Sequence, residues 1–210
     1  YSATMMPAGA KGTPNHAEKV MKYYSIATGD SSAEISLLEG NSGLKVVYYN
    51  QGDAAWKSIP YSTSTIGQSG CGPTSMAICI STLSGKKITP RQTCQWAGSQ
   101  GYYVKGAGSK HDVIPGLAKK YGVKCKGVGK NKPQIIQALK TGKLVVAIMS
   151  AGHFTSGGHF IVLTGIKDGK ITVADCGSRQ RTKQTWSLDL IVDESNSSAS
   201  AGGPFWIISK

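Results

Sequence analysis

The sequence predicts an α+β domain in which helical segments come first and strands later. Between about residues 71 and 140, apolar residues recur at helix spacing, and Gly or Pro residues mark the ends of each segment. After residue 143, short apolar and β-branched runs alternate with Gly, Ser and Asp turns, which is typical of strands. The chain has 210 residues and is 40% hydrophobic, so it is long enough for one full domain with an appendage.

The first 40 residues differ in composition from the rest of the chain. Residues 1–15 are rich in Pro, Gly, Ala, Ser and Thr and carry little apolar pattern, which is typical of a linker or ragged terminus. Apolar residues then recur at helix spacing from Ala17 onward, and this predicts a helix over 16–39. We therefore expect an N-terminal linker and helical leader over residues 1–40 and a globular domain over 41–210.

The globular domain is predicted to open with a strand over 44–49 and to continue with four helices. Pro90 and Pro133 suit the first turn of a helix, and Gly85 and Gly122 suit the residue that ends one. The four helices are expected over about residues 71–85, 89–97, 113–122 and 133–139. Strands are expected over residues 143–149, 159–166, 170–175, 184–190 and 205–209.

The net charge of +13 favours polyanionic partners, such as nucleic acid, anionic lipid or the acidic polymers of a bacterial wall. The lysines are dispersed and no basic motif is interleaved with aromatic residues, so specific nucleic-acid binding is not expected. The longest apolar stretch, 144–149, is too short to span a bilayer. Since the chain begins at Tyr1 and not at Met, we expect a mature form or a piece of a longer protein.

The five cysteines are an odd number, so at least one thiol is unpaired. They form no C-x-x-C pair, and the four histidines do not stand at zinc-ligand spacing from them. No structural zinc is therefore expected, and hydrolysis by a thiol requires no cofactor. Two disulfides with a free Cys71 and five free thiols both remain open. The cysteines are Cys71, Cys79, Cys94, Cys125 and Cys176.

Cys71 is the candidate nucleophile. It stands between two glycines, and Pro73 follows at the start of the predicted helix. At a helix N-terminus, unpaired N–H groups and the macrodipole favour an anion, and this lowers the pKa of a thiol. The alternative is a buried structural cysteine beside a glycine turn, because free cysteines are commonly buried.

His159 opens a predicted strand, and a hairpin brings Asp175 close to it. The segment 166–170 predicts a type I turn followed by a left-handed glycine, a G1-bulge hairpin that pairs its first and last residues. This register sets His159 opposite Gly177, with Asp175 a diagonal neighbour at roughly 7–8 Å between Cα atoms. The carboxylate can then accept the imidazole N–H and hold its tautomer. A two-residue turn would shift the register by one and place Asp175 on the other face.

Two positions of the site have competing candidates. His153 lies in a Gly/Ser-rich loop and is the alternative base, but no carboxylate stands at a defined spacing to orient it. A side-chain amide upstream of Cys71 can assist its backbone N–H in stabilising an oxyanion. Gln68 is the nearest such amide, Gln51 is the competitor, and either can equally be a turn residue.

Four segments follow one another along the chain: Tyr49–Asp53 with Trp56, Ser64–Ser75, Gly158–Gly165, and Ala174–Asp175. This series resembles the bacterial papain-like cysteine peptidases related to the double-glycine leader peptidases, and most closely their free-standing secreted and wall-associated relatives. The resemblance covers roughly residues 45–210. In the leader peptidases, a glutamine six residues before the cysteine commonly serves the oxyanion, where this chain has Thr65.

The resemblance implies a papain-like α+β fold with the nucleophile at the N-terminus of a central helix packed on an antiparallel sheet. It implies Cys71 as nucleophile, His159 as general base and acid, and Asp175 as the group that orients His159. The expected activity is amide hydrolysis of peptidoglycan peptides by a secreted or cell-surface protein of a Gram-positive bacterium. The alternatives are a peptidase acting on a protein or leader peptide, and an inactive binding module. Loops around Trp56, Tyr102 and His153 are expected to contact substrate.

Overall fold

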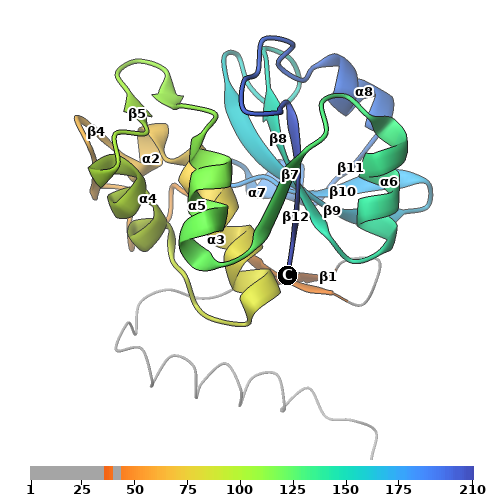
Figure 1. The fold of residues 1–210 in the computed structure, drawn as a ribbon, viewed down its shortest axis with the longest axis horizontal. Coiled ribbons are helices and arrows are strands. Elements are labelled where there is room, and N and C mark those ends of the chain that lie inside the picture. Colours follow the sequence, from red (N-terminus) through yellow and green to blue (C-terminus); the bar gives the residue numbers. More distant parts are fainter. Residues whose placement is uncertain (1–35, 40–43) are drawn as a thin grey trace, which may run out of the picture. The chain divides into compact units, whose positions relative to one another are not determined.

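The computed structural model describes residues 36–39 and 44–210. A six-stranded antiparallel sheet forms its centre, with strand order β11-β10-β9-β8-β12-β7 (Figure 1). Its strands are β7 (Lys124–Gly127), β8 (Leu144–Met149), β9 (His159–Lys167), β10 (Lys170–Ala174), β11 (Thr185–Trp186) and β12 (Phe205–Ser209). The predicted α+β class, with helices packed on an antiparallel sheet, is confirmed.

Helices cover both faces of this sheet. Phe160 of β9 lies against Gly72 of helix α3 (Cys71–Ser84), whereas its neighbour Ile161 belongs to a core cluster with Leu139 of helix α6 (Lys132–Lys140). Because successive side chains of a strand point to opposite faces, α3 and α6 lie on opposite sides. Burial on both sides explains why β8 is apolar throughout and not alternating.

The central helix α3 is buried along most of its length, as expected for a helix that carries almost no polar stripe. Helix α4 (Pro90–Ser99) begins with a capping box between Thr89 and Gln92. Helices α3 and α5 (Val113–Tyr121) both end at a left-handed glycine, as predicted. The other helices are α2 (Ile66–Ser69), α7 (Arg179–Thr182) and α8 (Leu188–Asp193).

Short strand pairs complete the described part of the chain. They are β1 (Ser36–Glu39) with β2 (Lys45–Tyr48), β3 (Pro60–Tyr61) with β4 (Ser64–Thr65), and β5 (Tyr103–Val104) with β6 (Gly108–Ser109). The predicted helix over 16–39 is wrong at its end, because 36–39 pair with β2 as a strand; residues 16–35 lie outside the described residues. The predicted strand over 184–190 is also wrong in its second half, where Ser187 starts helix α8.

The hairpin between β9 and β10 differs from the prediction in the position of its irregularity. Lys167 pairs with Lys170 around a two-residue turn in which Asp168 and Gly169 have φ of 50° and 74°. Positive φ at both positions is typical of a type I′ turn, so the predicted G1 bulge is wrong. The extra residue is instead Thr164 in β9, because Gly165 pairs with Thr172 and Leu163 with Val173.

The observed turn is one residue shorter than the predicted one. The bulge at Thr164 shifts the pairing by one residue and so compensates for the shorter turn. Beyond it, the register Val162–Ala174, continued toward the strand start, sets His159 opposite Gly177 as predicted. The Cβ of a side chain at Gly177 would lie 3.0 Å from the Cε1 of His159. The hairpin therefore brings the start of β9 and the residues after β10 together.

Candidate active site

Cys71 is the first residue of α3, where the helix leaves its first N–H groups without intrahelical partners. The chain reaches it through a tight turn after α2, in which the N–H of Gly70 donates to the carbonyl of Ile66 at 2.8 Å. A Cβ at position 70 would lie 2.6 Å from that same carbonyl oxygen, so the turn admits only glycine there. The Gly-Cys-Gly sequence thus places the half-buried Cys71 at a helix N-terminus.

His159, at the start of β9, lies between Cys71 and Asp175. Its Nε2 is 2.7 Å from Oδ1 of Asp175, and both side chains are buried, with 11% and 0% exposed. Since Nε2 donates to the carboxylate, Nδ1 is the ring nitrogen that remains to interact with the Cys71 thiol. The imidazole is thus hydrogen-bonded to the carboxylate on one side and interacts electrostatically with the thiol on the other.

Asp175 has further partners that hold it in place. Its Oδ1 also accepts the backbone N–H of Gly177 at 2.8 Å, and its Oδ2 accepts Nε–H of Arg181 at 2.5 Å. Its backbone carbonyl accepts the hydroxyl of Tyr48 at 2.8 Å. Sequence reasoning missed Arg181; its position six residues after Asp175, in a turn of helix α7, carried no motif that pointed to it.

The surroundings of Cys71 and His159 favour a thiolate–imidazolium pair. Burial alone would raise the pKa of the Cys71 thiol, but the hydrogen bond and positive charge of His159 outweigh burial and lower it below its ordinary value. Burial would lower the pKa of His159, yet Asp175 and Cys71 raise it to about 9. For Asp175, burial is likewise outweighed by His159 and Arg181, so its pKa is lowered. At neutral pH the geometry thus supports an activated nucleophile.

The two candidate glutamines lie in different environments. Gln68 is exposed, and its Oε1 accepts the hydroxyl of Ser64 at 3.2 Å within the same turn region. Gln51 is half-buried; its Oε1 is 3.5 Å from Sγ of Cys176, and this sulfur is also 3.5 Å from the carbonyl oxygen of Cys71. The structure therefore brings Gln51 next to the Cys71 backbone and leaves Gln68 on the surface.

The amide of Gln51 is also held in one orientation. Its Nε2 donates to the carbonyl of Gly67 at 2.8 Å, and its backbone N–H donates to the carbonyl of Cys176 at 2.8 Å. An amide nitrogen carries two hydrogens, so one donor remains beyond the bond to Gly67. Gln51 thus keeps one amide N–H donor close to the N-terminus of α3.

The three residues expected to contact substrate lie in three different settings. Trp56 is a correction: it is only 2% exposed, and its Nε1 donates to the carbonyl of Asn50 at 2.7 Å, so it is a core residue and not a cleft wall. Tyr102 is half-buried and rests on Trp96, with ring centroids 5.8 Å apart. His153 is exposed on the β8–β9 loop and hydrogen-bonds to Glu194.

All five cysteines are free thiols, so of the two alternatives that the sequence left open the structure has the second. Burial raises the pKa of the four cysteines other than Cys71, which are Cys79, Cys94, Cys125 and Cys176. Among the described residues, no group of three or more His, Cys, Asp and Glu is arranged to hold a metal ion. In the same part of the chain, no helix is both long and apolar enough to cross a bilayer.

Comparison with known proteins agrees with this architecture. Residues 43–200 match the model of the Peptidase_C39 like family. A structure described as C39-like, from Bacillus anthracis, is 17% identical with a TM-score of 0.51 and covers 85% of this chain and 98% of its own. The peptidase domain of Streptococcus ComA, a bifunctional ABC transporter of a quorum-sensing pathway, is 13% identical with a TM-score of 0.48, covering 67% of this chain and 91% of its own. No curated protein matches the chain. The chain belongs to the Peptidase_C39-like family, and it is a thiol hydrolase of the cysteine peptidase class.

Proposed function

We propose that Cys71, His159 and Asp175 form the catalytic triad of this peptidase. The observation that carries the proposal is the short, buried bond between His159 Nε2 and Asp175 Oδ1, beside a thiol at the N-terminus of α3. The pKa of the thiol is lowered and that of the imidazole is raised to about 9, as an ion pair requires. An inactive binding module has no need of this buried charged arrangement.

In the proposed reaction, the Cys71 thiolate attacks the carbonyl carbon of the scissile amide. The tetrahedral intermediate collapses when the C–N bond breaks, and the imidazolium Nδ1 of His159 gives its proton to the leaving amine. A thioester on Cys71 remains. His159, now neutral, takes a proton from water, which attacks the thioester and releases the carboxylic acid and the thiolate. Asp175 keeps the imidazole oriented throughout.

The oxyanion of the intermediate is proposed to accept the backbone N–H of Cys71 and the second Nε2 hydrogen of Gln51. This assignment replaces Gln68, whose amide is exposed and hydrogen-bonded to Ser64. Loss of one oxyanion donor commonly reduces kcat by about 10²–10³-fold. Gln51→Ala is therefore expected to be far more damaging than Gln68→Ala.

The proposed substrate is a peptide of a Gram-positive cell wall, cleaved by a secreted or cell-surface protein. The net charge of +13 supports this setting, because wall polymers are polyanionic and long-range attraction concentrates a basic enzyme on them. Charge alone does not choose among the amide bonds of the wall. Cleavage as an endopeptidase and cleavage as an amidase both fit the proposal.

The test is incubation of the purified protein with wall sacculi and, separately, with a peptide that carries a double-glycine leader sequence. We expect new amino termini from sacculi with the wild type and with Lys86→Gln, a matched surface variant, but not with Cys71→Ala. Mass spectrometry of the released fragments identifies the bond. Release by Cys71→Ala at the wild-type rate would refute the triad, and cleavage of the leader peptide alone would refute the wall substrate.

A further inference from the structure

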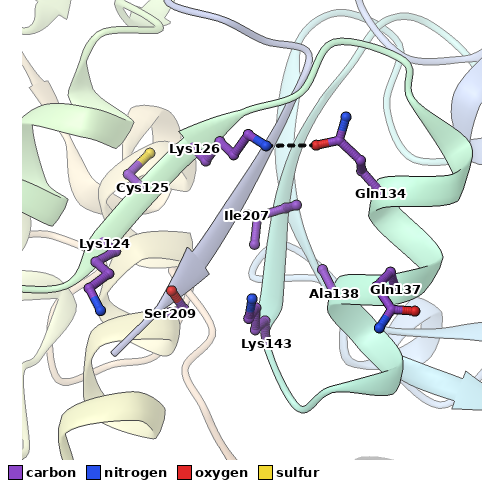
Figure 2. Close-up of a pocket in the computed structure, with 9 residues that line it drawn as sticks. All are labelled: Lys124, Cys125, Lys126, Gln134, Gln137, Ala138, Lys143, Ile207 and Ser209. Atoms are coloured by element: carbon purple, nitrogen blue, oxygen red, sulfur yellow. Dashed lines mark hydrogen bonds between the residues drawn. The ribbon is translucent and has the colours of Figure 1, made fainter.

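A second feature of the molecule, away from Cys71, is an open pocket of about 360 Å³ between strands β7 and β12 and helix α6 (Figure 2). We call it the lysine pocket. Three lysines, two glutamines and a serine are among the residues that line it. These six residues are Lys124, Lys126, Lys143, Gln134, Gln137 and Ser209.

The lysine pocket is strongly cationic, because three lysines and no acidic residue line it. Lys126 donates to Oε1 of Gln134 at 2.9 Å, a neutral partner, as the dashed line in Figure 2 shows. None of the ion pairs between described residues involves Lys124, Lys126 or Lys143. The local sequence adds to this field, since residues 113–167 contain nine lysines and no Asp or Glu. Three like charges are thus held around one hollow without a counter-charge from its walls.

The other groups of the lysine pocket suit a hydroxylated ligand. The bond from Lys126 engages the oxygen of Gln134, so the amide N–H₂ of Gln134 is left as a donor. Gln137 and Ser209 add groups that both donate and accept. The half-buried Ile207 and the buried Ala138 form an apolar floor on which carbon atoms of a ligand can pack.

The shape and composition of the lysine pocket indicate which class of polyanion it suits. No aromatic side chain lines it, whereas single-stranded nucleic acids are commonly held by stacking of bases on aromatic rings. A concave site with hydrogen-bonding groups favours a discrete phosphate with neighbouring hydroxyls over the plane of a lipid surface. We propose that the lysine pocket binds a phosphodiester-linked polyol polymer, with lysines on the phosphates and amides on the hydroxyls.

This site is separate from the catalytic one. Lys143 directly precedes β8, whose last residue, Met149, pairs with His159. Five residue steps from Leu144 to Met149 correspond to about 17 Å along the strand. The lysine pocket therefore lies at the opposite end of β8 from the catalytic histidine. A polymer bound there would hold the enzyme on the wall while the active site takes a peptide.

The binding test uses Cys71→Ala protein, so that no hydrolysis occurs, and a fluorescent synthetic glycerol-phosphate oligomer at low salt. The pocket variant carries Lys124→Gln, Lys126→Gln and Lys143→Gln. The control variant carries Lys86→Gln, Lys105→Gln and Lys170→Gln, three exposed lysines outside the pocket that give the same change in net charge. All six lysines are exposed, so both variants are expected to melt like the parent.

We expect the pocket variant to lose affinity on the order of 100-fold, since one lysine beside a polyanion contributes about a fivefold gain. The control variant should lose less than tenfold. The single change Gln137→Glu, which adds a negative charge at an exposed position of the pocket, should weaken binding by about fivefold. Single-stranded DNA of equal phosphate number and phosphatidylglycerol vesicles should bind both triple variants equally.

Equal losses of affinity for the oligomer in the two triple variants would overturn the proposal, because the net charge of the protein would then explain the binding. A loss of DNA or vesicle binding confined to the pocket variant, with no such loss for the oligomer, would assign the pocket to another class of polyanion. The proposal shares the wall setting of the proposed function but not its chemistry. Its failure leaves sacculus cleavage by Cys71 untouched, and failure of that cleavage leaves the binding result standing.

Discussion

Arg181 is the second cationic partner of the buried Asp175 carboxylate, and its removal tests how the site is held together. Its Nε donates to Oδ2 of Asp175 at 2.5 Å, on the side opposite His159. Arg181→Gln keeps a polar side chain of moderate length but removes the positive charge. The remaining partners of the carboxylate are then His159 and the N–H of Gly177.

Two magnitudes follow from this geometry. Removing one member of a buried ion pair costs about 3–5 kcal/mol, but Arg181 is 29% exposed and Asp175 keeps two partners, so we expect a loss of about 2 kcal/mol in unfolding free energy. The guanidinium and the imidazolium are separated by a carboxylate and hydrogen bonds of 2.5 and 2.7 Å, hence by roughly 7 Å. At an effective dielectric constant of about 20, which includes screening by solvent, their repulsion is about 2 kcal/mol.

The direction of the pKa change is therefore upward. Arg181 disfavours the imidazolium, so without it the pKa of His159 should rise by about 1.5 units above its value of about 9. The assay is NMR titration of ¹⁵N-labelled histidine, together with urea unfolding. Arg179→Gln is the matched control, because Arg179 pairs with Asp53 near the surface and its loss should cost under about 1 kcal/mol.

An unchanged or lowered pKa of His159 in Arg181→Gln would refute this reasoning, as would equal shifts in the two variants. Arg181→Lys restores the charge without the planar guanidinium, so it should recover most of the pKa value but less of the stability.

Three further outcomes are expected. Iodoacetamide should label Cys71 ahead of the other four cysteines, with a half-maximal rate at a pH well below the ~8.5 of a free thiol. His159→Ala should move this midpoint to higher pH. An ordinary thiol profile in the wild type would contradict the ion pair. Gly177→Ala should slow this labelling by about tenfold, because the new Cβ would lie 3.0 Å from Cε1 of His159. Gly157→Ala, with open space around it, should leave the rate unchanged. Equal rates in the two variants would show that the His159 ring is not confined by residue 177. Trp56→Phe should lower the unfolding free energy by about 1 kcal/mol through loss of the hydrogen bond to Asn50, and it should leave the labelling of Cys71 unchanged. Trp96→Phe should lower the unfolding free energy by less. A loss of labelling in Trp56→Phe would show that Trp56 contributes to the active site.

The elements with strong periodicity were predictable from the sequence, and the site depended on details that periodicity does not encode. Buried strands such as Leu144–Met149 and the helix at Cys71 follow from apolar patterns and glycine ends. The hairpin register at His159 was predicted for an incorrect reason. Asp168 and Gly169 form a type I′ turn, and Thr164 supplies a bulge that no local pattern announces.

Side chains that act across long sequence separations were the least predictable. Gln51 meets Cys176 over 125 positions, and only the folded chain shows that it, and not the nearer Gln68, lies beside Cys71. Trp56 stood in a recognisable motif, yet its indole N–H is used inside the core. Strand β7 was not predicted, because its Lys-Cys-Lys-Gly sequence has little apolar character. It lies at the edge of the sheet, where lysines commonly prevent pairing with another chain.

The central claim is that Cys71 carries an acyl-enzyme, and intact-protein mass spectrometry tests it most directly. The wild type is mixed with defined wall muropeptides, quenched in acid during turnover, and digested to locate any adduct. The account predicts a thioester-linked fragment on the peptide that contains Cys71, and neither adduct nor cleavage with Cys71→Ala. Cleavage that persists in Cys71→Ala, or an adduct on one of the other four cysteines, would contradict it.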